Sequence, residues 1–197
     1  MAPYLMPAEG APQDRVWMAF PCEGYSLGDT DQARHEARST WAAVAHAVAQ
    51  FEPVTMLVDP AELAVAKRYI SQGIELIEAP LNDAWMRDIG PTFVHADDGS
   101  VAAVDWTFNG WGAQDWARWD RDAEIGAMVG ELAGVTVCRP LSSTRAVASR
   151  PMGTARCWSP RPCNSTRTVI PVPPRSVWRP SWRAPSARPT WCGCPTG

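Results

Sequence analysis

The side chains of this sequence best suited to binding a small charged molecule lie in one short stretch, Asn82-Asp83-Ala84-Trp85-Met86-Arg87-Asp88. A carboxylate such as Asp88 can accept two hydrogen bonds at once from a planar cation, which fixes the orientation of that cation. The indole of Trp85 can add an apolar or cation–π wall. In isolation, however, such a stretch is more often a structural turn in which the acid pairs with Arg87. The hypothesis of a binding site therefore depends on the rest of the chain.

Other groups with catalytic or metal-binding chemistry are scattered along the sequence. His35 and His46 fall on a predicted helix, mostly away from its apolar face, and His95 closes a predicted hairpin, so all three are expected to be structural or exposed. Cys22 and Cys138 sit beside predicted strands and are expected to be small buried residues. The two cysteines nearest the C-terminus are too close for a structural zinc site. Because the sequence also lacks a glycine-rich phosphate loop, neither a zinc site nor a nucleotide is implied by these residues.

Charge is divided unevenly along the 197 residues. All 21 acidic residues and the single lysine lie before Pro140, and that part has a net charge of −12. Residues 141–197 contain 9 Arg, 10 Pro, 4 Trp and 4 Cys but no acid, which gives +9. The chain does not open with a basic segment and an apolar run, and it contains no 18 consecutive apolar residues. We therefore expect a cytoplasmic protein with no membrane partner.

Residues 1–140 have the pattern of an α/β domain, in which strands alternate with helices. Apolar runs predict buried strands at 16–20, 54–58 and 74–77. Asp29 or Thr30 can cap a first helix. Its buried face is expected to consist of apolar residues at three- and four-residue spacing, namely Ala33, Ala37, Trp41, Val44, Val48 and Phe51.

The remaining elements follow in the same order. Asp59-Pro60 opens a second helix that is expected to reach about Gln72. A hairpin is predicted at 92–95 and 101–106, because the turn sequence Asp-Asp-Gly between them tolerates positive φ angles. A last helix spans about 121–132. Since hairpin strands pair antiparallel, mixed sheet pairing is expected.

Three motifs together resemble a known family in their order and spacing. They are Trp17-Met18-Ala19-Phe20-Pro21, the eleven residues from Asn82 to Thr92, and Asp105-Trp106-Thr107-Phe108-Asn109-Gly110-Trp111-Gly112. Through these motifs, residues 5–138 resemble the agmatine deiminase and bacterial peptidylarginine deiminase family. The sequence departs from the family pattern at Gly10 and Gln13, which bears on the choice of substrate within the family.

The resemblance implies a pentein fold, an α/β propeller of ββαβ modules, of which this chain would hold a truncated N-terminal part. It also implies hydrolysis of a guanidinium to a ureido group with release of ammonia, without metal or cofactor. The substrate would be a small cationic guanidine, with agmatine as the first choice and free or peptidyl arginine as the alternative. Asp88 matches the carboxylate that binds the guanidinium, and Trp85 would form a wall beside it.

Weaker candidates accompany these two residues. Asp83 is either a residue that supports the site from behind or a solvated turn acid. Trp111 is a candidate for the wall of the site or for the core, as are Trp106, Trp116 and Trp119. The nucleophilic cysteine and the acid/base histidine of the family are not recognisable, so the resemblance implies that this chain alone is inactive.

Residues 141–197 are predicted to be a disordered, non-native tail, since their prolines interrupt both helix and strand. One constant shift of reading frame, within the codons that these residues allow, converts Ser142–Ser149 into V-N-E-G-G-G-I and restores acids and periodicity further on. We therefore interpret the tail as out of frame. Nucleic-acid binding by the Arg- and Trp-rich tail is an alternative, but no fold would aim those arginines, and we expect no nucleic-acid partner. A non-catalytic interaction fragment is a third interpretation.

Overall fold

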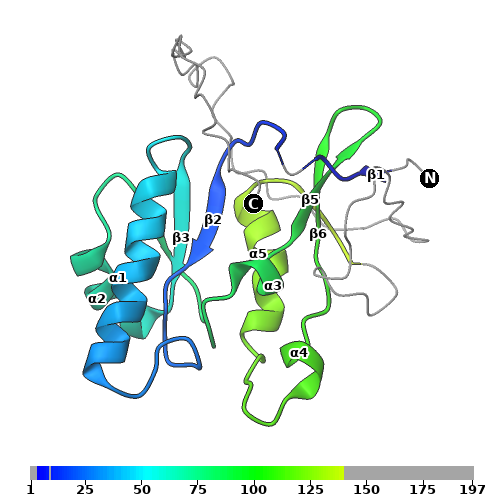
Figure 1. Ribbon diagram of the computed structural model, residues 1–197. Coiled ribbons are helices and arrows are strands. Elements are labelled where there is room, and N and C mark those ends of the chain that lie inside the picture. Colours follow the sequence, from blue (N-terminus) through cyan, green and yellow to red (C-terminus); the bar gives the residue numbers. More distant parts are fainter. Residues whose placement is uncertain (1–3, 9, 140–197) are drawn as a thin grey trace, which may run out of the picture. The chain divides into compact units, whose positions relative to one another are not determined.

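The computed structural model of the chain describes residues 4–8 and 10–139, which all fall within one compact unit. The predictions made for residues 141–197 lie outside the described residues. Strands and helices alternate along the described chain, and the strands form two sheets (Figure 1). The predicted α/β class is therefore confirmed, and mixed pairing is confined to the second sheet.

The first sheet is wholly parallel and has β3 (Val54–Val58) between β2 (Val16–Ala19) and β4 (Glu75–Glu78). All five residues of β3 are buried, as expected for an apolar strand in a parallel sheet that is covered on both faces. Alternate side chains of β3 point to opposite faces of the sheet. Met56 packs with the first two helices, and Leu57 packs with the later ones. The three predicted strands are thus confirmed to within one residue at each end.

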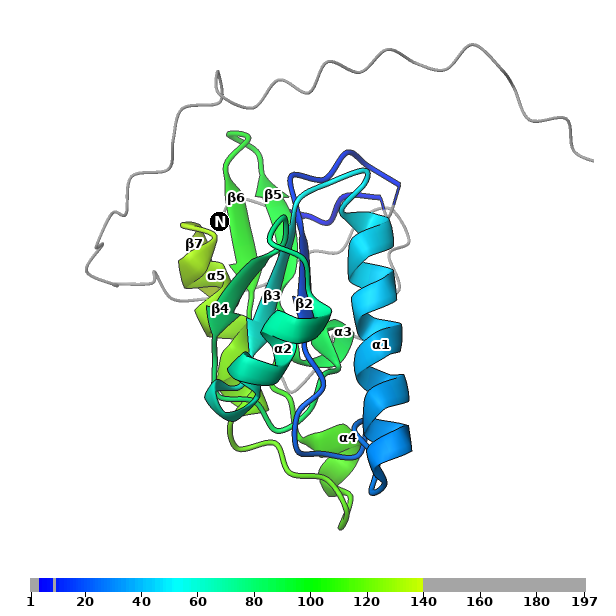
Figure 2. The ribbon, with the colours of Figure 1, turned by 90° about the vertical axis from the view of Figure 1, so that its left-hand side faces the viewer.

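Two helices cover one face of this sheet (Figures 1 and 2), α1 (Asp31–Val48) and the shorter α2 (Leu63–Tyr69). The start of α1 is as predicted, because the hydroxyl group of Thr30 accepts a hydrogen bond from the backbone N–H of Ala33 at 3.1 Å. A 3₁₀ turn precedes α2, and α2 ends before Gln72, so the second helix is shorter than predicted.

The predicted buried face of α1 is partly wrong. Val44 is 49% exposed, and Phe51, which lies beyond the end of the helix, is 69% exposed. The residues that α1 buries completely are Ala42 and Ala45. A stripe of alanines lets the helix axis approach the sheet more closely than valine would, and the helix is rotated accordingly. The larger apolar residue at position 44 then faces outward.

The second sheet has the order β1 (Tyr4–Leu5), β5 (Thr92–Ala96), β6 (Val101–Val104) and β7 (Thr136–Cys138). β5 and β6 form the predicted hairpin, and Gly99 in its turn has a φ of 77°. The second hairpin strand ends two residues earlier than predicted. β1 and β7 are short edge strands that no periodic pattern in the sequence indicated.

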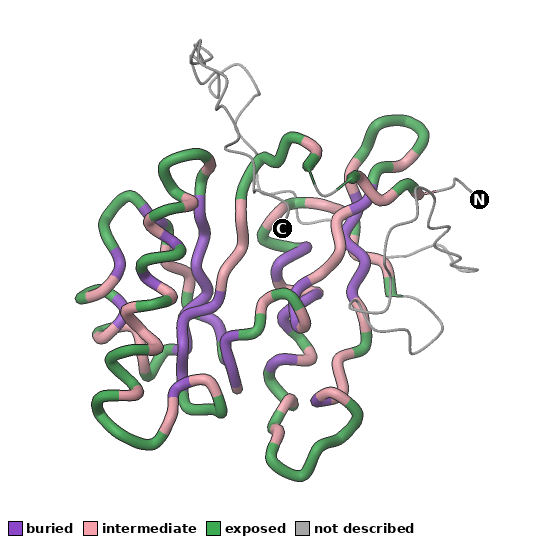
Figure 3. Tube along the Cα trace, in the orientation of Figure 1, coloured by how far each residue is buried: buried purple, intermediate pink, exposed green. Residues whose placement is uncertain are grey.

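A single ββαβ unit results from the way the second sheet is connected. β5 and β6 pair antiparallel, the helix α5 (Ile125–Leu132) follows a 3₁₀ turn η2 (Asp122–Glu124), and β7 then pairs parallel with β6. α5 packs closely on β7, since a β-carbon at Gly130 would come within 2.6 Å of the side chain of Val137. Figure 3 shows that the buried residues are concentrated in β3, α5 and the neighbouring strands.

Candidate functional site

The candidate site lies in the segments that follow the strands of the parallel sheet. Because β2, β3 and β4 run in one direction, the segments after their carboxyl ends meet at one edge, where open α/β sheets bind their ligands. The start of α1 and the one-turn helix α4 (Gly110–Ala113) lie at this same end of the strands in both views (Figures 1 and 2). The segment after β4 leads directly into α3 (Met86–Ile89).

The turn at the start of α3 presents Trp85 and Asp88. The carbonyl oxygen of Trp85 accepts hydrogen bonds from the backbone N–H groups of Asp88 at 2.9 Å and Ile89 at 3.1 Å. Ala84 and Ile89, each only 4% exposed, anchor the two ends of the turn in the core. Trp85 is 38% exposed and Asp88 is half-buried, so both side chains remain accessible to a ligand.

The environment of Asp88 has competing effects on its charge. Burial, the largest effect, raises the pKa of its carboxyl group above the usual value. A hydrogen bond from the side chain of Trp111 and the positive charge of Arg87 both lower that pKa. A partly desolvated carboxylate with an indole N–H donor is well suited to attract a cation, because little water has to be displaced from it.

Trp111 reaches Asp88 from an unusual backbone conformation. Four consecutive residues, Gly110 to Ala113, have φ angles of 59°, 56°, 99° and 58°, and two of them are not glycine. The side chain of Asn109 supports this left-handed turn by accepting a hydrogen bond from the backbone of Gly112 at 3.0 Å. A β-carbon at Gly110 would collide with the ring of Trp119, which explains the glycine. Strained backbone of this kind is often found where a side chain must be aimed at a ligand.

Aromatic rings make two groups of contacts near this turn. The rings of Trp111 and Trp116 are stacked with centroids 5.5 Å apart, and Tyr25 lies 5.1 Å from Trp116. In the second group, Trp85 makes an edge-to-face contact with Trp41 at 5.9 Å. The structure therefore brings together the predicted residues Asp88, Trp85 and Trp111, and adds aromatic residues from the loop after β2 and from α1.

An open hollow with a volume of about 310 Å³ lies beside Trp41, lined by residues 25–28 and the first three turns of α1. Glu36 is the one charged side chain among the residues that line it. The hydroxyl oxygen of Ser26 is buried without a hydrogen-bond partner. Trp41 belongs to this hollow and also contacts Trp85, so the hollow adjoins the aromatic wall of the candidate site.

Asp83 points into the protein rather than toward the aromatic surface. It is 5% exposed, and its carboxylate accepts a hydrogen bond from the backbone N–H of Ala84 at 2.7 Å. Cys22 lies nearby and is buried, as predicted. Burial, reinforced by the negative charges of Asp83 and Asp122, raises the pKa of the Cys22 thiol to about 12. This thiol is therefore neutral and not a nucleophile at physiological pH.

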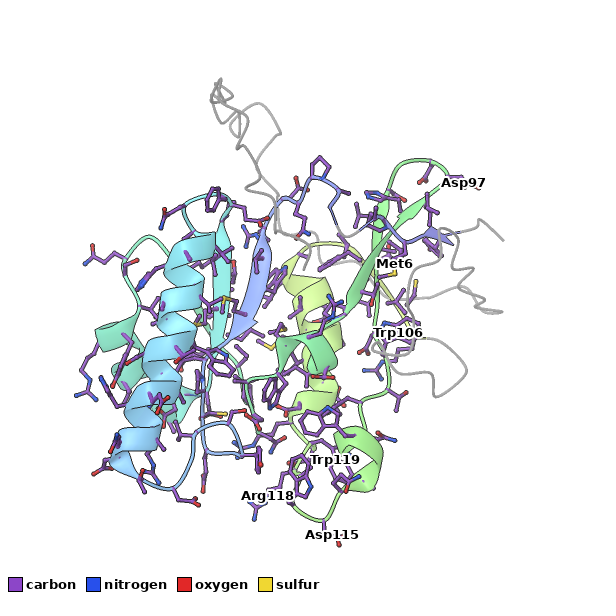
Figure 4. The ribbon with its side chains drawn as sticks, viewed as in Figure 1. Met6, Asp97, Trp106, Asp115, Arg118 and Trp119 are labelled. Carbon is purple, nitrogen blue, oxygen red and sulfur yellow. The ribbon has the colours of Figure 1, made fainter. Side chains whose placement is uncertain are left out.

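The other tryptophans have structural positions (Figure 4). Trp106 lies beside the hairpin, where its indole N–H donates to the hydroxyl of Thr92 at 2.8 Å, and it packs in the core of the second sheet. Trp119 lies beside α4 and fills the space over Gly110. Of the four tryptophans considered in this region, Trp111 contacts Asp88, Trp116 stacks on Trp111, and Trp106 and Trp119 serve the packing.

The three histidines are structural or exposed, as predicted. His35 is exposed and bonds to the hydroxyl of Tyr69 at 2.9 Å, and His46 accepts a hydrogen bond from the backbone of Ser71 at 3.0 Å. His95 is an exposed residue of β5. Across residues 4–8 and 10–139, no three side chains of the metal-binding types form a group that could hold an ion. None of the helices in these residues is long and apolar enough to span a membrane.

Comparison with known proteins identifies the family. Residues 5–145 match the sequence profile of the Porphyromonas-type peptidyl-arginine deiminases. The chain belongs to this deiminase family. A Streptomyces coelicolor protein described as a candidate agmatine deiminase is 52% identical over 134 residues, which are 68% of this chain and 39% of that protein. The agmatine deiminase of Pseudomonas putida is 43% identical over 135 residues, covering 66% of this chain and 35% of that enzyme.

Solved structures place the deiminase-family chain in the same fold. The agmatine deiminase of Enterococcus faecalis superimposes with a TM-score of 0.63 at 33% identity, over 70% of this chain and 38% of that one. The predicted family is thereby confirmed, together with the pentein fold that it implies. The chain spans less than two fifths of the length of these relatives.

Several contacts that tie the segments of the candidate site together were not predicted. Asp59 is the predicted helix cap, since it accepts a hydrogen bond from the backbone of Ala61 at 3.0 Å, but it also accepts from the backbone of Leu81 at 3.1 Å and from the side chain of Arg121 at 3.3 Å. Asn82 and Asp122 bind each other's backbone across 40 residues of sequence. The only sequence signal for Asn82 was its place in the second motif, and Asp122 had none.

Proposed function

We propose that the intact form of this protein is a guanidine deiminase that hydrolyses agmatine to N-carbamoylputrescine and ammonia, a reaction of putrescine biosynthesis. The observation that carries this proposal is the half-buried carboxylate of Asp88, which has a hydrogen bond from the Trp111 side chain and lies on the one-turn helix that begins after Trp85. A carboxylate can orient a planar guanidinium through two parallel hydrogen bonds, while the rings pack on its faces. The names of the relatives, agmatine deiminases from Pseudomonas putida and Enterococcus faecalis, support the same substrate.

Agmatine is favoured over arginine by the one charged side chain that lines the hollow beside Trp41. The two molecules share the guanidinium group but differ at the far end, where agmatine has an ammonium and arginine adds a carboxylate. The hollow beside Trp41 is lined by Glu36 and by no basic side chain. An acidic lining attracts an ammonium and repels a carboxylate. Deimination of free or peptidyl arginine is the second candidate activity.

The described residues supply binding but not bond cleavage. Replacing a C–N bond of the guanidinium by C–O requires a nucleophile on the central carbon and a proton for the departing ammonia. Cys22 cannot serve, because its thiol is buried and carries a raised pKa. The proposal therefore includes the expectation that the 197-residue chain binds agmatine without converting it. A non-catalytic fragment that pairs with a full-length relative is the remaining candidate role.

The test uses two proteins, the chain as given and a version with residues beyond 140 restored to the other reading frame and extended to the length of its relatives. The restored enzyme is expected to release ammonia and a ureido product from agmatine faster than from arginine or a peptidyl arginine. The 197-residue chain is expected to release neither. A restored enzyme that prefers arginine would support the second candidate activity, and one that converts no guanidine would contradict the proposed function.

A further inference from the structure

The backbone segments that contain Asn82 and Asp122 are tied together by reciprocal hydrogen bonds, which we call the Asn82–Asp122 clamp. The Asp122 Oδ1 atom accepts from the backbone N–H of Asn82 at 2.7 Å and of Asp83 at 3.4 Å. In return, the Asn82 Oδ1 atom accepts from the backbone N–H of Arg121 at 2.8 Å and of Asp122 at 3.1 Å. The Asn82 amide also donates to Asp120 at 3.1 Å.

The clamp acts on the turn that presents Asp88. Asp83 follows Asn82 directly, and its own carboxylate fixes the backbone N–H of Ala84, the residue before Trp85. The loop after β2 also packs against this segment, because a β-carbon at Gly24 would collide with the carbonyl oxygen of Asn82. The short link from Asn82 to the first residue of α3 is therefore held by contacts with two other segments, and little freedom remains in the direction in which α3 starts.

We propose that Asn82 and Asp122 are positioning residues for Asp88, since their reciprocal hydrogen bonds fix the turn that presents this carboxylate to a guanidinium. The inference rests on the proposed function for the role of Asp88, while the mechanical part concerns the turn alone. Asp122 is 1% exposed and contacts the backbone of residues 82 and 83, so it does not reach the proposed ligand surface itself.

The pKa of Asp122 indicates that its ionised carboxylate does not stabilise the folded domain. Burial is the main effect that raises the pKa of its carboxyl group to about 6, and the neighbouring charges of Asp83 and Asp120 add to it. The two backbone donors lower the pKa without offsetting that rise. A buried acid whose ionised form is disfavoured by the fold is a common feature of sites where geometry takes precedence over stability.

The experiment follows the turn directly in the full 197-residue chain, by amide hydrogen exchange of Asp88 and Ile89, whose N–H groups bond to Trp85. Asn82→Ala and Asp122→Ala remove the clamp, and both are expected to accelerate this exchange by roughly tenfold or more, the usual effect of losing buried hydrogen bonds. Asp122→Asn keeps an acceptor oxygen in place and should retain slow exchange. Glu124→Gln removes a charge from the same 3₁₀ turn outside the clamp and is the matched control.

A second readout separates positioning from general loosening. Exchange of the Phe20 N–H, which bonds to Leu57 in the parallel sheet, should stay unchanged in every variant. If Asp122→Ala also accelerates exchange of the Phe20 N–H, the substitution has unfolded the domain. The exchange of Asp88 and Ile89 in Asn82→Ala then tests the proposal. Unaltered exchange at Asp88 and Ile89 in the clamp variants would overturn the proposal, as would equal acceleration by Glu124→Gln or failure of Asp122→Asn to retain protection.

Agmatine titrated into the same proteins by calorimetry, with putrescine as the ligand that lacks a guanidinium, links the turn to binding. The clamp variants are expected to lose agmatine affinity in parallel with their faster exchange, and Asp122→Asn is expected to keep it. Loss of protection at the turn with unchanged agmatine affinity would overturn the positioning role. A parent chain that fails to bind agmatine would count against the proposed function, and the exchange comparison would still decide whether the clamp fixes the turn.

Discussion

Gly126 lies directly against the carboxylate of Asp105, and a β-carbon at this glycine would collide with the Asp105 Oδ1 atom. Asp105 is 5% exposed and also accepts a hydrogen bond from the Arg139 side chain at 2.7 Å. Gly126→Ala is therefore expected to destabilise the domain by about 1–3 kcal/mol, the usual effect of overpacking, although alanine favours helix. Urea denaturation measures this. Gly73→Ala, where a β-carbon would meet nothing within 4 Å, is the control, and equal effects would contradict the tight contact.

Asp122→Asn is expected to stabilise the domain in a pH-dependent way. The pKa of Asp122 is raised from 3.8 to about 6 in the folded protein, so the folded state binds a proton more tightly than the unfolded state. The stability due to this proton is fully present below the unfolded pKa and is lost as the pH rises through 6, a change of about 2–3 kcal/mol at most.

Because asparagine is neutral throughout, the variant should unfold at a higher temperature than the parent above pH 6. The two proteins should become equal in stability as the pH falls toward the unfolded pKa of 3.8. Thermal melts across this pH range give the comparison. A difference in stability that does not change with pH would mean that Asp122 is not the titrating group.

Asp88→Asn tests the proposed binding carboxylate in the restored, full-length enzyme. The substitution preserves shape but places an NH₂ group against guanidinium N–H groups, and losing the partner of a desolvated charge costs about 2–5 kcal/mol. This corresponds to a loss of roughly 30- to 4,000-fold in kcat/KM for agmatine.

Asp83→Asn is the comparison for Asp88→Asn, because Asp83 is buried and faces backbone instead of the aromatic surface. Its effect on kcat/KM is expected to be much smaller. Steady-state kinetics with thermal melts as the folding control provide the measurement. Parental kcat/KM for Asp88→Asn would show that its carboxylate has only a structural role.

Trp111→Phe should move the pH dependence of agmatine binding. The side chain of Trp111 lowers the pKa of Asp88 through a hydrogen bond that phenylalanine cannot make. Without it the pKa rises, so Asp88 becomes protonated, and affinity declines, at a higher pH on acidification. Calorimetric titrations between about pH 4 and pH 7 locate the midpoint. Trp116→Phe alters the ring stacked on Trp111 and should leave the midpoint where it is.

The DNA around the codons for Val137 to Ser143 tests the interpretation of the tail. The family match ends at residue 145, which is 14 residues beyond Glu131, the last acidic residue, and five residues beyond Pro140. We expect the other reading frame to encode an acidic, glycine-rich motif directly after this point. An independent sequence of the same gene that reproduces the printed frame through Gly197 would refute the frameshift.

Local signals in the sequence predicted most of the fold. The apolar run of β3, the Thr30 cap and the Asp-Asp-Gly turn each depend on a few neighbouring residues, and all three occur as predicted. The rotation of α1 could not be predicted, because Val44 and Ala45 both fit an apolar stripe, and only the distance to the sheet selects the smaller residue.

The candidate site was also predictable only in part, because some of its contacts join residues that are far apart in the sequence. Asp88 and Trp85 belong to one continuous motif, whereas Asn82 meets Asp122 across 40 residues of chain. Asn82 belongs to the same motif, but nothing in the sequence indicates that it pairs with Asp122. The left-handed turn at 110–113 could not be predicted from the sequence either, since Trp111 and Ala113 adopt positive φ angles that their residue types disfavour.

The buried thiol of Cys22 has a practical consequence for labelling experiments. Because the pKa of this thiol is about 12 and Cys22 is only 2% exposed, the thiol should resist iodoacetamide and similar electrophiles in the folded state. A restored enzyme could therefore be titrated with a thiol-directed covalent inhibitor without background from this residue. The onset of Cys22 alkylation in denaturant would then report the opening of the core between the parallel sheet and α5.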